Sequence, residues 1–207
     1  ETLGKLIHVL EYDSPILLTE EATLKAIALA EGFDQSLVME QPYLKGKNLL
    51  SSQNKTRIET ISPPDVRGQK SGWNHFDGVL ATNYHTDKNW SEIKEKDAEF
   101  ILNFDEAQGI RNVMVTFLDH TGMNIFPPSA IRLSYSVNGE EFVPLTEWTD
   151  FAVRETLNPE INRVEIPVNA SEVKKIKILV EPFGNMPAWY KGNGQPANLY
   201  VGEILID

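Results

Sequence analysis

The 207-residue sequence contains no cysteine, which excludes disulfide bonds, thiol nucleophiles and thiolate metal sites. Positive charge is scarce, because 19 Lys and Arg residues stand against 30 Asp and Glu residues, for a formal net charge of −11. This charge repels phosphates, so neither a nucleic acid nor an acidic membrane is expected as a partner. No apolar run approaches the roughly 20 residues that cross a bilayer, so membrane insertion is not expected either.

The opening residues lack the charged and apolar segments of a secretion signal, and the sequence starts at Glu1 as a cut fragment would. A chain without cysteine suits the periplasm or surface of a cysteine-poor bacterium as well as the cytoplasm. Composition alone therefore leaves the localisation open.

Apolar residues make up 41% of the sequence, enough for a core, and from about residue 99 onward they recur with a period of two. Such alternation indicates strands with one buried and one solvated face. Turn signals separate the runs, and Asn138-Gly139 between two of them predicts a hairpin. Many short strands at this spacing predict an antiparallel sandwich or barrel. The alternation is clearest in three runs: Phe100-Leu102-Phe104, Val113-Val115-Phe117 and Ile176-Ile178-Val180.

Residues 22–30 admit two local interpretations. Thr19 as a cap, two glutamates in the first turn and Gly32 as a stop favour a helix. A strand instead places Leu24 and Ala26 on one small apolar face. Local propensity favours the helix.

No catalytic motif accompanies the many acidic residues. No carboxylate pair lies in a pattern typical of glycosidases, and no Gly-x-Ser-x-Gly elbow accompanies Asp119-His120. We interpret Asp119 and His120 as residues of a solvated turn. The fragment is therefore expected to be non-catalytic.

The N-terminal segment Ser14-Pro15-Ile16-Leu17-Leu18-Thr19-Glu20 with Thr23-Leu24-Lys25-Ala26 resembles the chitobiase/hexosaminidase C-terminal module, an immunoglobulin-like sandwich. The resemblance covers about residues 1–43 and implies that only part of the module is present. It also implies a strand over 22–30, against the local helix signal.

A second resemblance covers about residues 44–207. Phe76-Asp77-Gly78-Val79 followed by Trp90, the run Ile125 to Phe142 with its Ser-x-Asn-Gly turn, and the ending Met186 to Ile204 resemble discoidin-like (coagulation factor 5/8 type C) domains. The resemblance implies an all-β fold: a discoidin-like, galactose-binding-like jelly-roll β-sandwich preceded by a partial Ig-like β module.

The ending Pro187-Ala188-Trp189 to Glu203-Ile204 is similar to discoidin-like domains attached to family 20 β-N-acetylhexosaminidases. It implies a non-catalytic accessory region of a secreted, periplasmic or cell-surface bacterial glycoside hydrolase. The implied partners are a glycan and, in cis, the catalytic domain of the parent enzyme. Two alternatives stay open: a purely structural packing domain without a ligand, and an accessory domain of another secreted hydrolase such as a fucosidase, sulfatase or mannosidase.

The resemblance also implies a structural Ca²⁺ ion, held by Asp77 and Glu203. Calcium takes six to eight oxygen ligands, so carbonyl groups from Leu80 to Thr86 are expected to complete the site. The sequence departs from the family pattern here, because Val79 stands where an acidic residue is usual and the segment before Trp90 is longer.

Aromatic side chains on loops are the candidates for sugar binding, because an aromatic face packs on the apolar face of a pyranose. The candidates are Trp73, His75, Tyr84 and Trp148. Trp90 is expected in the core, and Trp189 in the core or in packing between domains.

Overall fold

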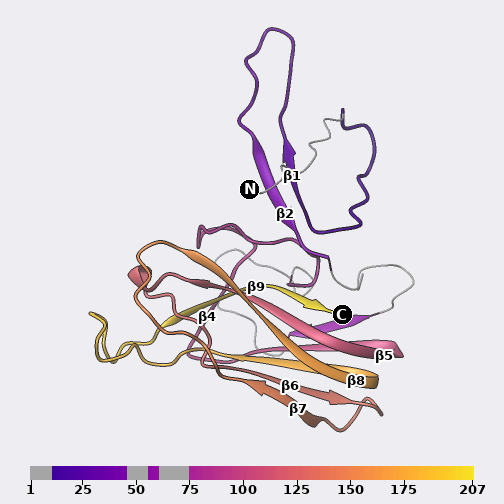
Figure 1. Ribbon diagram of the computed structural model, residues 1–207, viewed down its shortest axis with the longest axis vertical. Coiled ribbons are helices and arrows are strands. Elements are labelled where there is room, and N and C mark those ends of the chain that lie inside the picture. Colours follow the sequence, from indigo (N-terminus) through magenta and orange to yellow (C-terminus); the bar gives the residue numbers. More distant parts are fainter. Residues whose placement is uncertain (1–10, 46–55, 61–74) are drawn as a thin grey trace, which may run out of the picture.

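The computed structural model describes residues 11–45, 56–60 and 75–207 (Figure 1). Within these ranges the regular elements are β-strands and short 3-10 segments, with no α-helix, so the predicted all-β fold is confirmed. No helix in the described part of the chain is long and apolar enough to cross a membrane.

The strands follow the alternation seen in the sequence. Their bounds are β1 Ala22–Ala26, β2 Met39–Tyr43, β3 Arg57–Thr60, β4 Ser91–Lys94, β5 Ala98–Asp119, β6 Ala130–Ser136, β7 Val143–Trp148, β8 Glu160–Glu181 and β9 Asn198–Ile206, with the 3-10 helix η2 at Thr121–Met123. The hairpin predicted at Asn138-Gly139 joins β6 to β7, and Gly139 has a positive φ of 82° that suits glycine.

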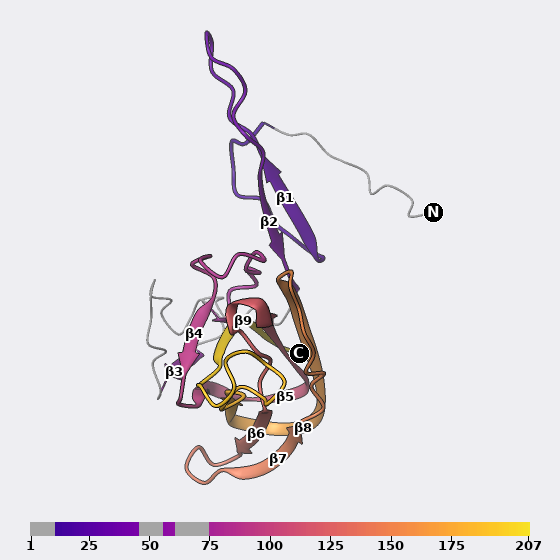
Figure 2. The ribbon, with the colours of Figure 1, turned by 90° about the vertical axis from the view of Figure 1, so that its left-hand side faces the viewer.

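The two longest strands, β5 and β8, each take part in both layers of a sandwich. Residues 98–103 of β5 pair with β3 and with residues 175–180 of β8, which continue to β6 and β7. Residues 113–119 of β5 pair with β9 and with residues 160–166 of β8, and β9 pairs with β4. The β5–β8 register shifts between residues 103 and 112, where the paired strands pass from one layer to the other. Figure 2 views the sandwich from the end that carries the loop of residues 182–197.

The core lies between these two layers. Side chains from the first layer, such as Phe100 and Ile178, and from the second layer, such as Val115 and Ile204, belong to one buried cluster and are at most 1% exposed. Replacing one such residue by alanine removes buried apolar contacts and leaves a cavity, at a cost of about 2–5 kcal/mol. Packing therefore fixes the ends of the strands from which the loops start.

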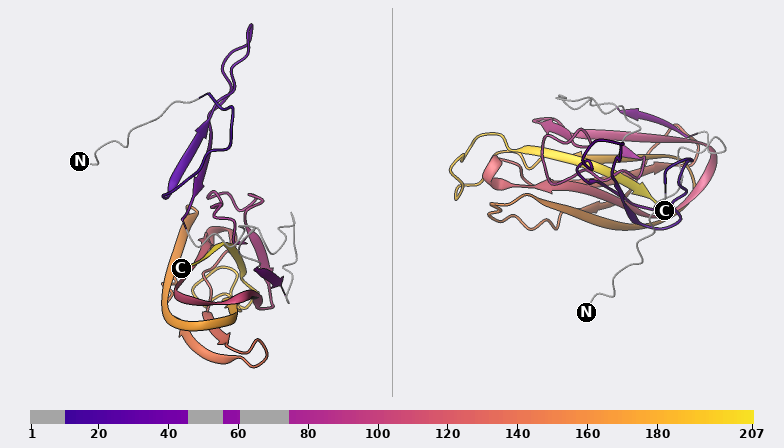
Figure 3. Two further views of the ribbon diagram at one scale, coloured as in Figure 1. Left: turned by 90° about the vertical axis from the view of Figure 1, so that its right-hand side faces the viewer. Right: turned by 90° about the horizontal axis from the view of Figure 1, so that it is seen from above.

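The β1–β2 ribbon projects from the sandwich (Figures 1 and 3). The strand expected over 22–30 is confirmed for Ala22–Ala26, which pair with Met39–Tyr43, while residues 27–30 belong to neither strand nor helix. Pairing with β2 outweighs the local helix preference, as tertiary context does elsewhere. Backbone bonds attach the ribbon to the sandwich: Leu44 N donates to Gly78 O at 2.9 Å, and Leu80 N donates to Pro42 O at 3.1 Å.

Candidate functional site

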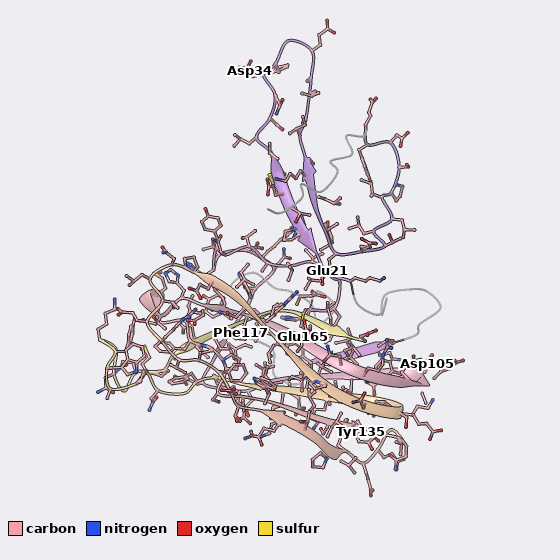
Figure 4. All side chains as sticks on the ribbon, in the orientation of Figure 1. Glu21, Asp34, Asp105, Phe117, Tyr135 and Glu165 are labelled. Carbon is pink, nitrogen blue, oxygen red and sulfur yellow. The ribbon has the colours of Figure 1, made fainter. Side chains whose placement is uncertain are left out.

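A cavity of about 300 Å³ lies beside the loop that joins β7 to β8. Its lining comes from the last residues of β5 and β7, the first residues of β8 and the loop of residues 149–157. In Figure 4, Phe117 lies near the end of β5, far from Asp105. Asp105 lies in the stretch where β5 passes from one layer to the other. The lining includes Phe117, Asp119, Trp148, Phe151, Arg154 and Asn162.

Three aromatic side chains form the apolar part of this cavity. Trp148 ends β7 and is half-buried, and its Nε1 donates to the carbonyl oxygen of Asp150 at 3.2 Å. Phe117 and Phe151 meet edge to face, with ring centroids 5.6 Å apart. These contacts orient the rings before any ligand arrives, which is the property a sugar-stacking surface needs.

Asp119 is the buried carboxylate of the cavity, with 3% of its surface exposed. Its Oδ1 accepts a hydrogen bond from Thr156 Oγ1 at 2.9 Å. Thr156 is itself held by two backbone bonds, since Thr121 N donates to its Oγ1 at 2.9 Å and its own N donates to Thr121 Oγ1 at 2.8 Å. Burial raises the pKa of Asp119 above its ordinary value, against the lowering effect of the Thr156 hydrogen bond.

The expectation that Asp119 lies in a solvated turn is therefore wrong. Residue 119 is the last residue of β5 and pairs with Glu160 of β8, so the strand continues into the apparent turn signal. The alternation of apolar residues in the sequence already indicated on which face of the strand Asp119 lies. Residues 113, 115, 117 and 119 share one face, and Asp119 therefore follows Val115 and Phe117 toward the interior.

The two arginines of the lining both have acidic neighbours. Arg154 Nη2 lies 2.5 Å from Glu160 Oε2. Arg163 lies 3.8 Å from Glu165, its neighbour on β8, and 3.9 Å from Glu21, which Figure 4 shows at the base of the β1–β2 ribbon. Both arginines of the lining therefore take part in ion pairs with glutamates.

The structure brings only one of the four predicted sugar-binding residues to this cavity. Trp148 lines it, whereas His75 and Tyr84 are absent from its lining. Tyr84 is 71% exposed, in the loop between the Asp77-Gly78 turn and β4. Trp73 lies outside the described residues.

His75 requires a correction, because its side chain is 1% exposed and faces the protein interior. One ring nitrogen, Nδ1, lies 2.6 Å from the carbonyl oxygen of Gly202, and the other, Nε2, lies 2.8 Å from Ser91 Oγ. A carbonyl oxygen can only accept, so Nδ1 carries a proton and donates to Gly202, while Nε2 shares a hydrogen bond with the Ser91 hydroxyl. The ring also packs edge to face on Phe100, at 4.8 Å between centroids. His75 therefore has a structural role and does not face a ligand.

The two predicted calcium ligands lie on segments that contact each other. Glu203 is fully buried, and its Oε1 accepts a hydrogen bond from Gly78 N at 2.6 Å. Asp77 Oδ1 accepts from Val79 N at 2.9 Å, as in an Asx turn. The structure thus connects the Asp77-Gly78 turn to the final strand through a protein hydrogen bond.

Three of the carbonyl groups expected to complete a calcium site already accept hydrogen bonds. Those of Leu80, Thr82 and Tyr84 accept from Gln41 Nε2, Trp90 Nε1 and Asp87 N. No group of three acidic or histidine side chains suited to a metal occurs among the described residues. This part of the chain supplies two carboxylates rather than a full calcium cage, and calcium binding stays a prediction.

The two other described tryptophans differ in burial. Trp90 is 2% exposed and packs with Leu118 and Ile125, as predicted. Trp189 is 54% exposed, on the loop of residues 182–197, and contacts the rings of Phe126 and Tyr190.

No family model matches the sequence, and no curated protein matches it. Similar solved structures include CpGH89CBM32-5 from Clostridium perfringens in complex with GalNAc-β-1,3-galactose, at 16% identity and a TM-score of 0.44, covering 73% of this chain and 94% of that chain. The C-terminal domain of a chitobiase from Bacteroides fragilis matches at 13% identity and a TM-score of 0.45, covering 73% and 92%. An F5/8 type C domain, also from Bacteroides fragilis, matches at 15% identity and a TM-score of 0.44, covering 73% and 90%. At these identities the likeness concerns the arrangement of strands alone.

Proposed function

We propose that this chain is a non-catalytic, carbohydrate-binding accessory domain and that its sugar site is the cavity beside Trp148. The observation that carries the proposal is the combination, in one cavity, of a fixed aromatic wall with the polar groups of Asp119 and Asn162. A pyranose has an apolar C–H face for the aromatic wall and hydroxyl groups for the polar side chains.

The size of the cavity sets the expected strength of binding. Its volume of about 300 Å³ is at the small end of the range for ligand pockets, so it suits one or two sugar rings. A shallow site of this size buries little of its ligand. Because immobilising the sugar still costs entropy, we expect weak, fast-exchanging binding.

For the parent protein we propose a secreted bacterial glycoside hydrolase, with a β-N-acetylhexosaminidase or chitobiase as the first candidate. The support is the resemblance of Pro187-Ala188-Trp189 to Glu203-Ile204 to the ending of discoidin-like domains in such enzymes. A fucosidase, sulfatase or mannosidase is the alternative parent, since this architecture serves many enzymes. The sequence upstream of Glu1 distinguishes them, because a family 20 catalytic barrel carries an adjacent Asp-Glu pair.

The test of sugar binding is a glycan array on the chain, followed by calorimetric titration with the best ligand. Trp148→Ala is expected to weaken binding by about tenfold or more, because it removes the largest ring of the aromatic wall. Trp189→Ala is the matched control, since Trp189 is an exposed tryptophan outside the cavity lining and its removal should leave the affinity unchanged. The proposal is contradicted if the chain binds no glycan on the array, or if Trp148→Ala binds the ligand with the same affinity as wild type.

One observation favours a packing domain as the second candidate function. Several large apolar side chains of the N-terminal segment are exposed, among them Leu17 at 86%, Phe33 at 81% and Leu37 at 88%. An apolar surface of this kind is typical of residues that contact another domain. A chain that binds no glycan but associates with the catalytic domain of its parent supports this alternative.

A further inference from the structure

We propose that Asp119 determines which sugars the cavity accepts: neutral sugars whose hydroxyl groups donate to its carboxylate, with acidic sugars such as uronic acids rejected. The inference rests on the proposed sugar-binding function and extends it to the class of ligand.

The carboxylate of Asp119 is placed to accept a hydrogen bond from a ligand. Its side chain lines the cavity although the residue is 3% exposed. Oδ1 accepts a hydrogen bond from Thr156 Oγ1. Within the described part of the chain, this is the one hydrogen bond seen at the carboxylate. An ionised carboxylate has room for several donors, so Oδ2 is left to face a ligand.

The reciprocal bonds between Thr121 and Thr156 hold this acceptor in place. Thr156 Oγ1 donates its single proton to Asp119 and receives the Thr121 N–H, so its orientation is fixed. A fixed acceptor pays little entropy when a hydroxyl binds to it. Hydrogen bonds to a buried charged group are also stronger than those between neutral groups.

The charges around Asp119 oppose a second anion. Glu160 is the acidic neighbour of Asp119, and Asp150 lines the same cavity. Three cations lie nearby: Arg154 pairs with Glu160, Arg163 lies 3.8 Å from Glu165 and 3.9 Å from Glu21, and His120 Nε2 lies 3.0 Å from the carbonyl oxygen of Leu157. A sugar carboxylate in this cavity would lie beside Asp119, while Arg154 and Arg163 already pair with glutamates. Like charges repel at close range in a partly buried site, so an acidic sugar should bind more weakly than its neutral counterpart.

A pH dependence of binding follows. A donating hydroxyl prefers the ionised carboxylate to the neutral acid, so a bound sugar holds Asp119 ionised. Affinity is therefore greatest above the pKa of Asp119 in the empty protein and declines as the pH falls through it. Burial raises that pKa, which places the decline above the ordinary aspartate range.

The experiment is calorimetric titration of the whole chain with paired sugars that differ only in a carboxylate: galactose with galacturonic acid, and glucose with glucuronic acid. We expect binding of the neutral member and at least about tenfold weaker binding of the acidic member. The affinity for the neutral sugar should also fall between about pH 7 and pH 4.

Asp119→Asn tests the residue itself, since it keeps the size of the side chain and removes the charge. It should weaken binding of the neutral sugar by about tenfold or more and abolish the pH dependence. Asp34→Asn is the control: Asp34 is an exposed aspartate outside the cavity lining, so its substitution should retain both the affinity and the pH profile. Should Asp119→Asn fail to fold, the sugar pairs and pH profile of the wild type still test the inference.

The outcomes separate the two proposals. If no sugar binds the wild type, the proposed function fails. If a neutral sugar binds and requires Trp148, but uronic acids bind as well or Asp119→Asn keeps the wild-type affinity and pH profile, the proposed function stands and the role of Asp119 is refuted.

Discussion

The imidazole Nδ1 of His75 lies 2.6 Å from the carbonyl oxygen of Gly202, although the two residues are 127 positions apart in the sequence. The contact joins the segment before the Asp77-Gly78 turn to the last strand. It lies beside a β-bulge of β9, where Gly202 and Glu203 together face the one residue Thr116, between the pairs Val115–Ile204 and Phe117–Val201. Thr116 Oγ1 donates to Glu203 O at 3.0 Å and so stabilises the bulge.

Replacing His75 by alanine is expected to destabilise the fold by about 2–4 kcal/mol. The change leaves the Gly202 carbonyl and the Ser91 hydroxyl without their buried partner and opens a cavity beside Phe100. Urea unfolding followed by tryptophan fluorescence measures the loss. Tyr84→Ala, at a position 71% exposed, is the control and should change the free energy of unfolding by less than about 0.5 kcal/mol. Equal stabilities of the two variants would show that the His75 contact contributes nothing.

Gly202→Ala is expected to destabilise the protein by about 1–3 kcal/mol through overpacking. A Cβ at this position would lie 2.7 Å from Thr116 Oγ1 and 2.7 Å from the ring of Trp90, and neither side chain has room to withdraw because both are buried. Gly109→Ala is the matched control, since its Cβ would meet nothing closer than Ala170 O at 4.0 Å. Thermal unfolding of the two variants side by side checks the prediction. A melting temperature of Gly202→Ala equal to that of wild type would contradict it.

The strand pattern could be predicted from the sequence because alternation is a local property. Val113, Val115 and Ile178 occupy the core positions that their period of two indicates. The 22–26 strand needed the family resemblance, since only pairing with β2 overrides its helix propensity.

The site was less accessible to sequence reasoning, because it depends on contacts between distant residues. His75 was expected on the surface from its glycine-rich surroundings, and its burial depends on a residue 127 positions away. Asp119 was assigned to a turn because Asp-His-Thr-Gly resembles one. The strand extends two residues past Phe117, and continuing the alternation would have identified Asp119 as inward-facing. Trp148 was one of the loop aromatics named from the sequence, and it lines the cavity; its role in sugar binding stays a prediction.

The calcium prediction is tested by removing divalent ions. If Asp77 and Glu203 hold Ca²⁺, binding to the folded state alone adds about 2.7 kcal/mol at a hundredfold excess of calcium over Kd, so a chelator should lower the melting temperature by several degrees. Asp77→Ala should abolish this response, whereas Asp34→Ala, at an exposed position near the tip of the β1–β2 ribbon (Figure 4), should retain it. A melting curve that excess chelator leaves unchanged would refute the calcium site. Asp77 would then act only as the acceptor for Val79 N.

Ionised Asp119 is expected to lower the free energy of unfolding at neutral pH, although the same carboxylate is proposed to bind the sugar. Burial raises its pKa in the folded state, so folding favours the protonated carboxyl and the ionised form is destabilising. A group with a raised folded-state pKa contributes stability that is fully present below its unfolded pKa and is lost as the pH rises through the folded value.

Asp119→Asn mimics the uncharged state and can still accept from Thr156, so the variant should be more stable than wild type near pH 7. The difference should shrink as the pH falls through the raised pKa of Asp119, because the wild-type carboxyl then becomes protonated too. Urea unfolding of both proteins across this range measures the difference, with Asp150→Asn, an exposed position, as the control that should show no such trend. A stability gap that is constant with pH would mean that Asp119 titrates alike in the folded and unfolded chains. A gain in stability at neutral pH together with weaker sugar binding would instead identify Asp119 as a residue retained for recognition at the expense of the fold.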